Sequence, residues 1–390
     1  MKTIYSISSL FFFIFLLGRV QAQCPEGDVT FIYQQDVDHF LIAYPDCAHI
    51  TGNLNIGEFG NVNTTVSDIS GLNSIMAIDG NLNISNTLLT NLQGLQNLTS
   101  LEGRLFVHEN NDLTTLEQLS NLTETGGLEI YSNEQLLSLT GLENISGVYG
   151  NLRLGYNQSL QNVSLTNMEL VSGYLEIINN LSLVSLSELN SLTFIGSNVW
   201  IGQNSQLVNL EGLESLTTVD GTFVRVFQNP QLVSLQGIEN LNLETFEGSG
   251  FGLIVNNNGS LTGCNLPNVC NYLSLDPVNY PREIMGNTGN CVDENAVLEA
   301  CNLGISDMEN LNENWQVYYQ KQTNSLIVKT EGFQLSGIQI YTSGGQLLKE
   351  LKGLSSNQEQ FQLISPNSIL IIKAISKEGK TFAKKVIIKN

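Results

Sequence analysis

Lysine is absent from most of this 390-residue chain. None occurs between Lys2 and Lys321, and residues 24–301 carry only four basic side chains against 30 acidic ones, which gives a net charge of −26. A region with that charge repels nucleic acid and anionic lipid surfaces at neutral pH, so neither is an expected partner. Residues 302–390 carry ten lysines and seven acidic side chains, a net of +3, and this change predicts a domain boundary near Cys301.

The side chains that usually carry out catalysis are also scarce. The sequence has three histidines, His39, His49 and His108, and it contains no nucleophile elbow, zinc-protease helix, phosphate-binding loop or calcium loop. His39 and His49 lie in or beside a segment that we expect to cap the N-terminus. His108 stands alone just after a predicted strand, where a histidine is more often packed or solvated than a ligand. We therefore expect no enzyme activity, no cofactor and no metal site.

A long apolar run occurs only at the N-terminus. Lys2 precedes the run Leu10–Leu17, and Val20-Gln21-Ala22 supplies a small-residue cleavage site, so residues 1–22 are expected to be a secretory signal. The run is too short to span a bilayer as a permanent helix, and no other stretch has the composition of one. The sequence predicts a secreted or cell-surface protein without a permanent transmembrane segment.

Cysteine is missing from the middle of the chain. All six cysteines lie near the two ends of residues 24–301, and an even number in an exported protein predicts disulfides. Cys24 and Cys47 are expected to pair as an N-terminal cap, because the apolar residues between them have helical spacing. The sequence does not determine how the other four pair; we expect Cys264 with Cys291 and Cys270 with Cys301. A zinc site is disfavoured, since zinc ligands usually come in more closely spaced pairs.

One repeated unit accounts for most of what the chain does contain. It reads Gly, any residue, Leu, any residue, Ile, with an Asn five residues after the Leu and then Leu at every third position. The lead apolar residues recur after 23 to 29 positions, and such a period predicts a solenoid whose coils bury their apolar faces only by stacking. These lead residues are Leu54, Leu82, Leu105, Leu128, Leu152, Leu175, Val199, Val224 and Leu253.

Each part of the unit predicts a local structure. The Leu-x-Ile alternation predicts a strand with one buried face, and the three-residue leucine step predicts short bridges and 3₁₀-like corners. In the coil after Asn157 the step is interrupted, and Leu165, Met168 and Leu170 indicate a local shift. The recurring Asn is expected to form a structural ladder that pairs backbone groups of neighbouring coils. The predicted ladder is Asn86, Asn110, Asn133, Asn157, Asn180, Asn204, Asn229 and Asn258.

The repeat resembles two related architectures. Its Leu and Asn spacing is similar to that of leucine-rich repeats. Its Gly-x-Leu-x-Ile strands and irregular coils more closely resemble the receptor L-domain of insulin-receptor-type and epidermal-growth-factor-receptor-type ectodomains. That resemblance implies a right-handed parallel β-helix, here a solenoid with disulfide caps over residues 23–301. Such scaffolds host many partners, so the resemblance says little about the ligand.

The tail reads as a second, all-β domain. After a polar linker at residues 302–308, residues 309–390 show seven short strand patterns, with Ser343-Gly344-Gly345 as a hairpin turn, and predict a small antiparallel β-sandwich. Three segments resemble the type A C-terminal sorting domain of the type IX secretion system of Bacteroidetes: Gly337–Tyr341, Gly344–Leu348 and Gly379–Lys389. The resemblance implies that this tail engages the secretion machinery and is usually removed afterwards. An ordinary adhesive sandwich is the alternative.

The residues between Leu and Ile in successive units would form the exposed face of the solenoid sheet. Outward Trp, Tyr and Arg are the residue types that anchor partners, so this face is the candidate binding site for an extracellular protein or glycan. Glu129, Arg153 and Glu176 would also form a cross-strand charge ladder, worth about 0.2–1 kcal/mol per pair, and the two interpretations are compatible. The candidate binding residues are Phe106, Glu129, Arg153, Tyr174, Glu176, Trp200, Arg225 and Phe227.

Two other functions stay open from the residues alone. Polysaccharide lyases and hydrolases also use β-helices. A lyase needs a base, often lysine or arginine, and lysine is missing from the coils, whereas paired carboxylates for glycoside hydrolysis are available anywhere among the 30 acidic residues. We expect a non-enzymatic recognition or adhesion protein, with a polysaccharide-active enzyme or a structural surface component as the alternatives.

Overall fold

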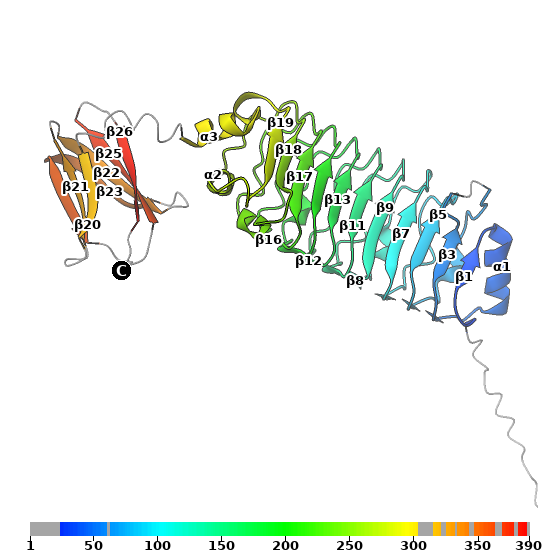
Figure 1. The fold of residues 1–390 in the computed structure, drawn as a ribbon. Coiled ribbons are helices and arrows are strands. Elements are labelled where there is room, and N and C mark those ends of the chain that lie inside the picture. The colour runs from blue at the N-terminus through cyan, green and yellow to red at the C-terminus, as the bar shows by residue number, and fades with distance from the viewer. Residues whose placement is uncertain are drawn as a thin grey trace, which may run out of the picture.

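The solenoid and the tail each have a hydrophobic core of their own. A computed structural model describes residues 24–60, 63–302, 315–320, 325–331, 334–342, 347–362, 369–377 and 381–387 (Figure 1). The expected secretory signal at residues 1–22 and the linker residues 303–308 lie outside these described residues. Asn302, which the sequence assigned to the linker, ends helix α3 (Glu294–Asn302) instead.

One strand from each coil joins a long parallel sheet, which has 11 strands within the described residues. Residues alternate between buried and outward positions along these strands, as the period of two predicts. The lead residues of the repeat are register partners from strand to strand. The strands are β1 (Val29–Phe31), β3 (Leu54–Gly57), β5 (Leu82–Ser85), β7 (Arg104–His108), β9 (Gly127–Tyr131), β11 (Leu152–Gly155), β13 (Leu175–Ile178), β15 (Val199–Gly202), β17 (Phe223–Phe227), β18 (Gly252–Asn256) and β19 (Arg282–Met285).

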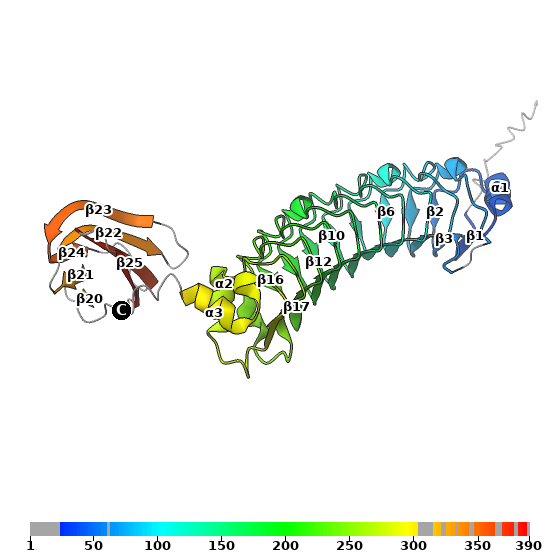
Figure 2. The same ribbon diagram turned by 90° about the horizontal axis from the view of Figure 1, so that it is seen from above.

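The rest of each coil contributes short bridges and corners. Two-residue strands form a three-stranded and a five-stranded parallel sheet, and several coils turn through a 3₁₀ corner on the side away from the long sheet (Figure 2). The short strands are β2 (His49–Ile50), β4 (Ala77–Ile78), β6 (Ser100–Leu101), β8 (Glu124–Thr125), β10 (Gly147–Val148), β12 (Leu170–Val171), β14 (Phe194–Ile195) and β16 (Thr218–Val219). The corners are η1 (Ser70–Leu72), η2 (Glu117–Leu119), η3 (Ser187–Leu189), η4 (Leu243–Phe246) and η5 (Gly289–Cys291).

The leucines of the three-residue step stack inside the solenoid as predicted. Leu113, Leu116, Leu119 and Leu122 are all fully buried, and their counterparts in the other coils lie in the same core. In the coil after Asn157, Leu165 and Met168 are buried, because Ser164 adopts a left-handed conformation (φ 43°) that shifts the step by one residue. Leu170 is only half-buried and lies in β12, so its assignment to the shifted column was wrong.

The asparagine ladder forms, with one correction. From Asn110 to Asn258 each Asn is fully buried, and its backbone N–H donates to Oδ1 of the next Asn. Asn86 is outside the ladder: Thr87 holds that position and donates to Asn110. Asn86 instead begins a column of left-handed residues, one per coil, with φ between 52° and 59°. The ladder also continues to Asn287, which accepts from the backbone N–H of Asn258 at 2.9 Å.

Disulfides close both ends of the solenoid. Cys24–Cys47 fastens the segment that carries helix α1 (Gln34–Ala43), where Val37 and Phe40 are buried against the first coil. At the other end Cys264 pairs with Cys291 and Cys270 with Cys301, as expected, around helices α2 (Pro267–Leu273) and α3. The caps cover the apolar ends that a stack of coils would otherwise expose.

The described part of the tail consists of antiparallel strands in two sheets. One sheet has the order β20-β21-β24 and the other β23-β22-β25-β26, with Trp315, Phe361 and Ile372 in their shared core. The predicted hairpin turn at 343–345 lies outside the described residues, but the strands on either side of it pair as a hairpin requires. The strands are β20 (Trp315–Gln320), β21 (Ser325–Thr330), β22 (Leu335–Thr342), β23 (Leu347–Ser356), β24 (Gln358–Gln362), β25 (Ile369–Ser376) and β26 (Thr381–Ile387).

Candidate binding face

The register of the long sheet brings six of the eight predicted binding residues into one row, and Tyr174 and Phe227 flank it. The residues after the lead Leu or Val are partners on successive strands, and they form the central row of the outward face. The row is Asn55, Asn83, Phe106, Glu129, Arg153, Glu176, Trp200 and Arg225. It continues to Thr30 at one end and to Ile254 and Glu283 at the other. Sequence reasoning missed these three, although Ile254 follows the recognised lead residue Leu253.

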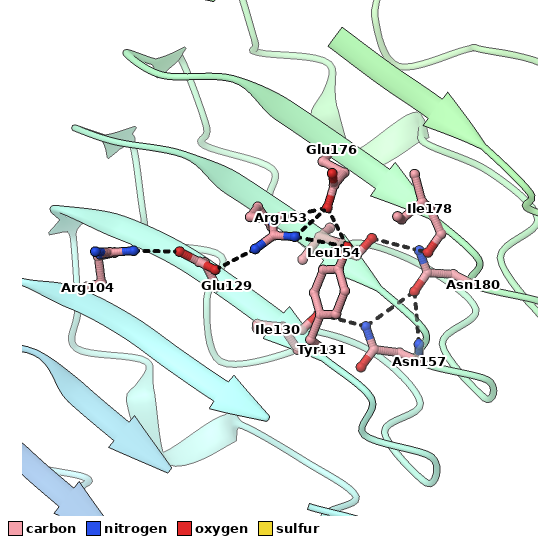
Figure 3. A network of polar contacts seen from close by, with 10 residues as sticks. All are labelled: Arg104, Glu129, Ile130, Tyr131, Arg153, Leu154, Asn157, Glu176, Ile178 and Asn180. Atoms are coloured by element: carbon pink, nitrogen blue, oxygen red, sulfur yellow. Dashed lines mark hydrogen bonds and ion pairs between the residues drawn. The ribbon is translucent and has the colours of Figure 1, made fainter. Parts of the chain in front are cut away.

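The middle of the face is a compensated ionic network (Figure 3). Glu129, whose side chain is only 5% exposed, accepts from Arg104 at 2.9 Å and from Arg153 at 3.1 Å. Arg153 also pairs with Glu176 at 3.0 Å, and the hydroxyl of Tyr131 donates to the same carboxylate. The predicted charge ladder is therefore present, and two positive and two negative side chains cancel within it. Glu129 is buried, so the expectation that it is exposed for a partner was wrong.

An aromatic group lies on the N-terminal side of this network. His108 stacks on Phe106 with ring centroids 3.5 Å apart and on Tyr131 at 5.4 Å, and Phe59 contacts both Phe106 and His108. Burial, helped by Arg153 and opposed by Glu129, lowers the pKa of His108 to about 4. The ring is therefore neutral at pH 7 and packed. His108 is the last residue of β7 rather than a residue after it.

A second aromatic group, Tyr174, Trp200, Phe223 and Phe251, lies on the C-terminal side. Trp200 contacts Tyr174 and Phe223 edge to face, at centroid distances of 5.4 and 4.8 Å, and Phe223 contacts Phe251 at 5.8 Å. Phe251 is 58% exposed. Sequence reasoning missed Phe223 and Phe251. The alternation could have located Phe223, which lies two positions before Arg225 in the same strand.

Arg225 is the arginine of this region without an acidic partner. Among the described residues, Arg104 and Arg153 pair within the network and Arg282 pairs with Glu294 at 2.6 Å. The guanidinium of Arg225 lies 4.6 Å from the ring centroid of Phe227, and its buried Nε has no hydrogen-bond partner. A cation held over a ring and lacking an acceptor is suited to an external anion.

Two glycines allow aromatic rings to lie flat on this face. A Cβ at Gly202 would come within 2.3 Å of the Phe227 ring, and one at Gly155 within 2.5 Å of the Tyr131 ring. Each ring therefore covers a neighbouring strand where a side chain is absent. This fixes Phe227 under Arg225 and Tyr131 beside Arg153, which contacts that ring at 4.7 Å. Arg153 is thus positioned by a ring and by carboxylates, and Arg225 by a ring.

Other candidate sites are weaker. Within the described residues, no group of three or more His, Cys, Asp or Glu side chains is arranged to hold a metal ion. In the same part of the chain, no helix is long and apolar enough to cross a membrane. A shallow polar pocket lies where the short sheets are interrupted between β6 and β8, with Glu102, Glu124 and Tyr149 in its lining. The hydroxyl of Tyr149 donates to Glu124 at 3.3 Å. Two of the polar groups that line the pocket are therefore already paired with each other.

Comparison with known protein families gives a match over the solenoid. The family model described as "Receptor L domain" matches twice, at residues 46–147 and 144–244. Each match contains four strands of the long sheet: β3, β5, β7 and β9 in the first, and β11, β13, β15 and β17 in the second. No curated protein matches the chain. Receptor L domains and disulfides are typical of extracellular proteins. Because the two matches together span slightly more than half of the 390 residues, the chain belongs to the receptor L-domain family.

Proposed function

We propose that this protein is a secreted or cell-surface recognition protein that binds an extracellular protein or glycan through the outward face of its long sheet, without catalysing a reaction. The observation that carries this proposal is the C-terminal half of the face, where three half-buried aromatic rings and the exposed Phe251 lie near an arginine without an acidic partner. Aromatic residues and arginine dominate the energy of many binding sites. A receptor L-domain is a ligand-binding scaffold, which agrees with that use.

The polar residues of the face favour binding over catalysis. Both oxygens of Glu129 are occupied, by Arg104 and Arg153, and Oε1 of Glu176 is occupied by Arg153 and Tyr131. A general acid or base must reach the substrate within hydrogen-bond distance. His108 is stacked between rings and has a lowered pKa of about 4, so it is a poor proton donor or acceptor near pH 7. These features support a site that holds a ligand unchanged.

The export route that belongs to this proposal uses both ends of the chain. Residues 1–22 would direct the chain across the inner membrane of a bacterium, and residues 309–390 would direct it through a type IX system to the outside. The antiparallel pairing of β22 with β23, across the segments that resemble the sorting domain, is compatible with this role. An extracellular destination also agrees with the three disulfides.

The experiment that tests the proposal applies the full chain to a glycan array, to a panel of extracellular proteins and to pectin-type and alginate-type polysaccharides. Retention without turnover supports a binding protein. Release of reducing or unsaturated ends identifies an enzyme, and the absence of both effects favours a structural surface component.

Two matched variants then test whether the sheet face is responsible. The Trp200→Ala/Arg225→Ala variant should lose a ligand that the wild type retains. Tyr149→Ala removes a ring that is 56% exposed and lies after β10, away from the long sheet, and it should retain the ligand. If the double variant stays folded and binds with full affinity, the face is not the binding site.

A further inference from the structure

We propose that the C-terminal half of the face binds a single carboxylate carried on a sugar ring, with Arg225 holding the carboxylate and Trp200 contacting the ring. This inference rests on the proposed function and assigns a ligand class to that same face. It follows from four observations: the surroundings of Arg225, the aromatic group beside it, the area of the patch and the charge of the solenoid.

The fold isolates Arg225 from carboxylates on both sides. Its register partners are Trp200 on one neighbouring strand and Ile254 on the other. The next acidic residues in the row are one strand further away: Glu176, which pairs with Arg153, and Glu283, which accepts from Asn256 at 2.8 Å.

An external anion would supply what Arg225 lacks. A guanidinium has its donors in a planar fork that matches a carboxylate. The Nε of Arg225 is buried and has no acceptor. The covered Nε keeps its cost, while a carboxylate bound at the terminal nitrogens would pair with the charge of the guanidinium.

The aromatic group favours a ligand with a flat, partly apolar body. Trp200 is adjacent to Arg225, and Tyr174, Phe223 and Phe251 extend the aromatic surface over neighbouring coils. A free inorganic anion would use none of these rings. A pyranose ring has apolar C–H faces that pack on aromatic side chains, and its hydroxyls stay in water. The carboxylate of an acidic sugar therefore suits both parts of the patch.

The area of the patch argues against a protein partner at this position. Four strands about 4.8 Å apart and five residues along each strand give a patch of about 300 Å². Stable protein interfaces cover about 800 Å² on each partner. The inner strands are also paired on both sides, so they offer no backbone groups for an added peptide strand. The patch has the size of a small saccharide.

The charge of the solenoid limits the ligand to few negative groups. Residues 24–301 carry a net charge of −26, and a polyanion approaching Arg225 would be repelled by that field. A single carboxylate on a neutral glycan gains the local contact with Arg225 and meets less repulsion than a chain of carboxylates or sulfates does.

Isothermal titration of the full chain with methyl β-D-glucuronide and with methyl β-D-glucoside tests the inference. The two probes differ only in the carboxylate. We expect the glucuronide to bind at least about tenfold more tightly, as the loss of one charge-assisted hydrogen bond implies. Arg225→Gln should abolish that preference, and Trp200→Ala should weaken the binding of both probes.

A matched control separates the local contact from the general field. Arg104→Gln makes the same change in charge in the N-terminal half of the face, and Glu129 keeps its pairing with Arg153. This variant should retain the preference for the glucuronide within about twofold, since an exposed charge that far from the site is largely screened. An equal loss in Arg104→Gln and Arg225→Gln would overturn the assignment of Arg225.

Other outcomes also decide the matter. Equal binding of glucuronide and glucoside, or no binding of either, contradicts the inference. If N-acetylglutamate amide binds as tightly as the glucuronide, the site takes a carboxylate without a sugar ring and the assignment to an acidic sugar is wrong. If neither sugar binds but the array yields another ligand that the Trp200→Ala/Arg225→Ala variant loses, the proposed function stands and this inference fails.

Discussion

Asn157 and Asn180 lie one coil apart and are joined twice, because the backbone N–H and the Nδ2 of Asn157 both donate to Oδ1 of Asn180 at 3.2 Å. Nδ2 of Asn157 also donates to the carbonyl of Ile130 in the preceding coil at 2.9 Å (Figure 3). One side chain therefore connects three coils. The same arrangement repeats along the ladder, so it holds the coils in the register that aligns the binding face.

Replacing Asn157 with Ala should destabilise the solenoid by about 3 kcal/mol. The change removes acceptors from Asn133 and a donor from Ile130 in a buried site, and each unsatisfied buried group costs about 1–3 kcal/mol. Urea unfolding followed by circular dichroism measures the effect. Asn86→Gly is the control, because Asn86 lies outside the ladder and has φ 53°, which glycine adopts freely, and its side chain loses only partly exposed hydrogen bonds, to the Glu58 carbonyl and to Glu109. The urea concentration at its unfolding midpoint should change little. Equal losses of stability in Asn157→Ala and Asn86→Gly would show that a ladder asparagine contributes no more than one outside the ladder.

The ionic network crosses the boundary between the two family matches. Arg104 and Glu129 belong to the first match, and Arg153 and Glu176 to the second. Arg153→Met should cost about 3 kcal/mol, because it takes an arginine partner from two carboxylates, Glu129 and Glu176, whose side chains are only 5% and 17% exposed. In the Glu129→Ala/Arg153→Met variant the more buried of these carboxylates is gone, so the loss should be smaller. Thermal unfolding of the wild type, the single variant and the double variant tests this prediction. A larger loss of stability in the double variant than in the single variant would contradict it.

His108 should make the protein less stable in mild acid. Its folded-state pKa of about 4 lies below the ordinary value of 6.5, so the unfolded chain binds the proton first as the pH falls. The contribution of the neutral ring is complete above pH 6.5 and decreases as the pH falls toward 4, by up to about 3 kcal/mol. His108→Phe keeps a ring in the stack and should flatten the dependence over that range. Parallel curves for wild type and variant would show that His108 does not titrate as described.

The tail offers a test that is independent of the ligand. Residues 309–390 fused to a reporter that carries a secretory signal should bring the reporter to the surface of a bacterium with a type IX system. The matched control carries the signal without the tail and should stay in the periplasm. Surface labelling with antibody distinguishes the two. A fusion that remains in the periplasm would favour the alternative, an ordinary adhesive sandwich.

The repeat made the fold predictable because leucine recurs at the positions where each coil must bury a side chain against its neighbours. Leu105, Leu128 and Leu152 had to be stacked and buried, and they are. Asn86 was misplaced because it follows Leu82 by four residues instead of five; the five-residue spacing points to Thr87, which takes the ladder role, while Asn86 occupies the left-handed position before it. Asn287 was missed because its coil begins with Arg282 in place of the lead leucine.

The candidate site was less predictable, because exposure on the sheet depends on neighbours from other coils. Glu129 reads as an outward residue from the alternation of its strand, yet Arg104 and Arg153 bury it. Arg225 reads like the other arginines, and only the register shows Trp200 and Ile254 beside it. Local spacing predicts which side a residue faces, and the packing of adjacent strands decides whether that residue is available to a partner.

Hydroxyl-radical footprinting of the full chain, with and without a ligand retained on the array, tests the central claim most directly. The account predicts that oxidation of Trp200 and Phe251 falls when the ligand is bound and that oxidation of Tyr149, on the far side of the coil, stays the same. Protection of Tyr149 with no change at Trp200 would contradict it and would place the binding site off the long sheet.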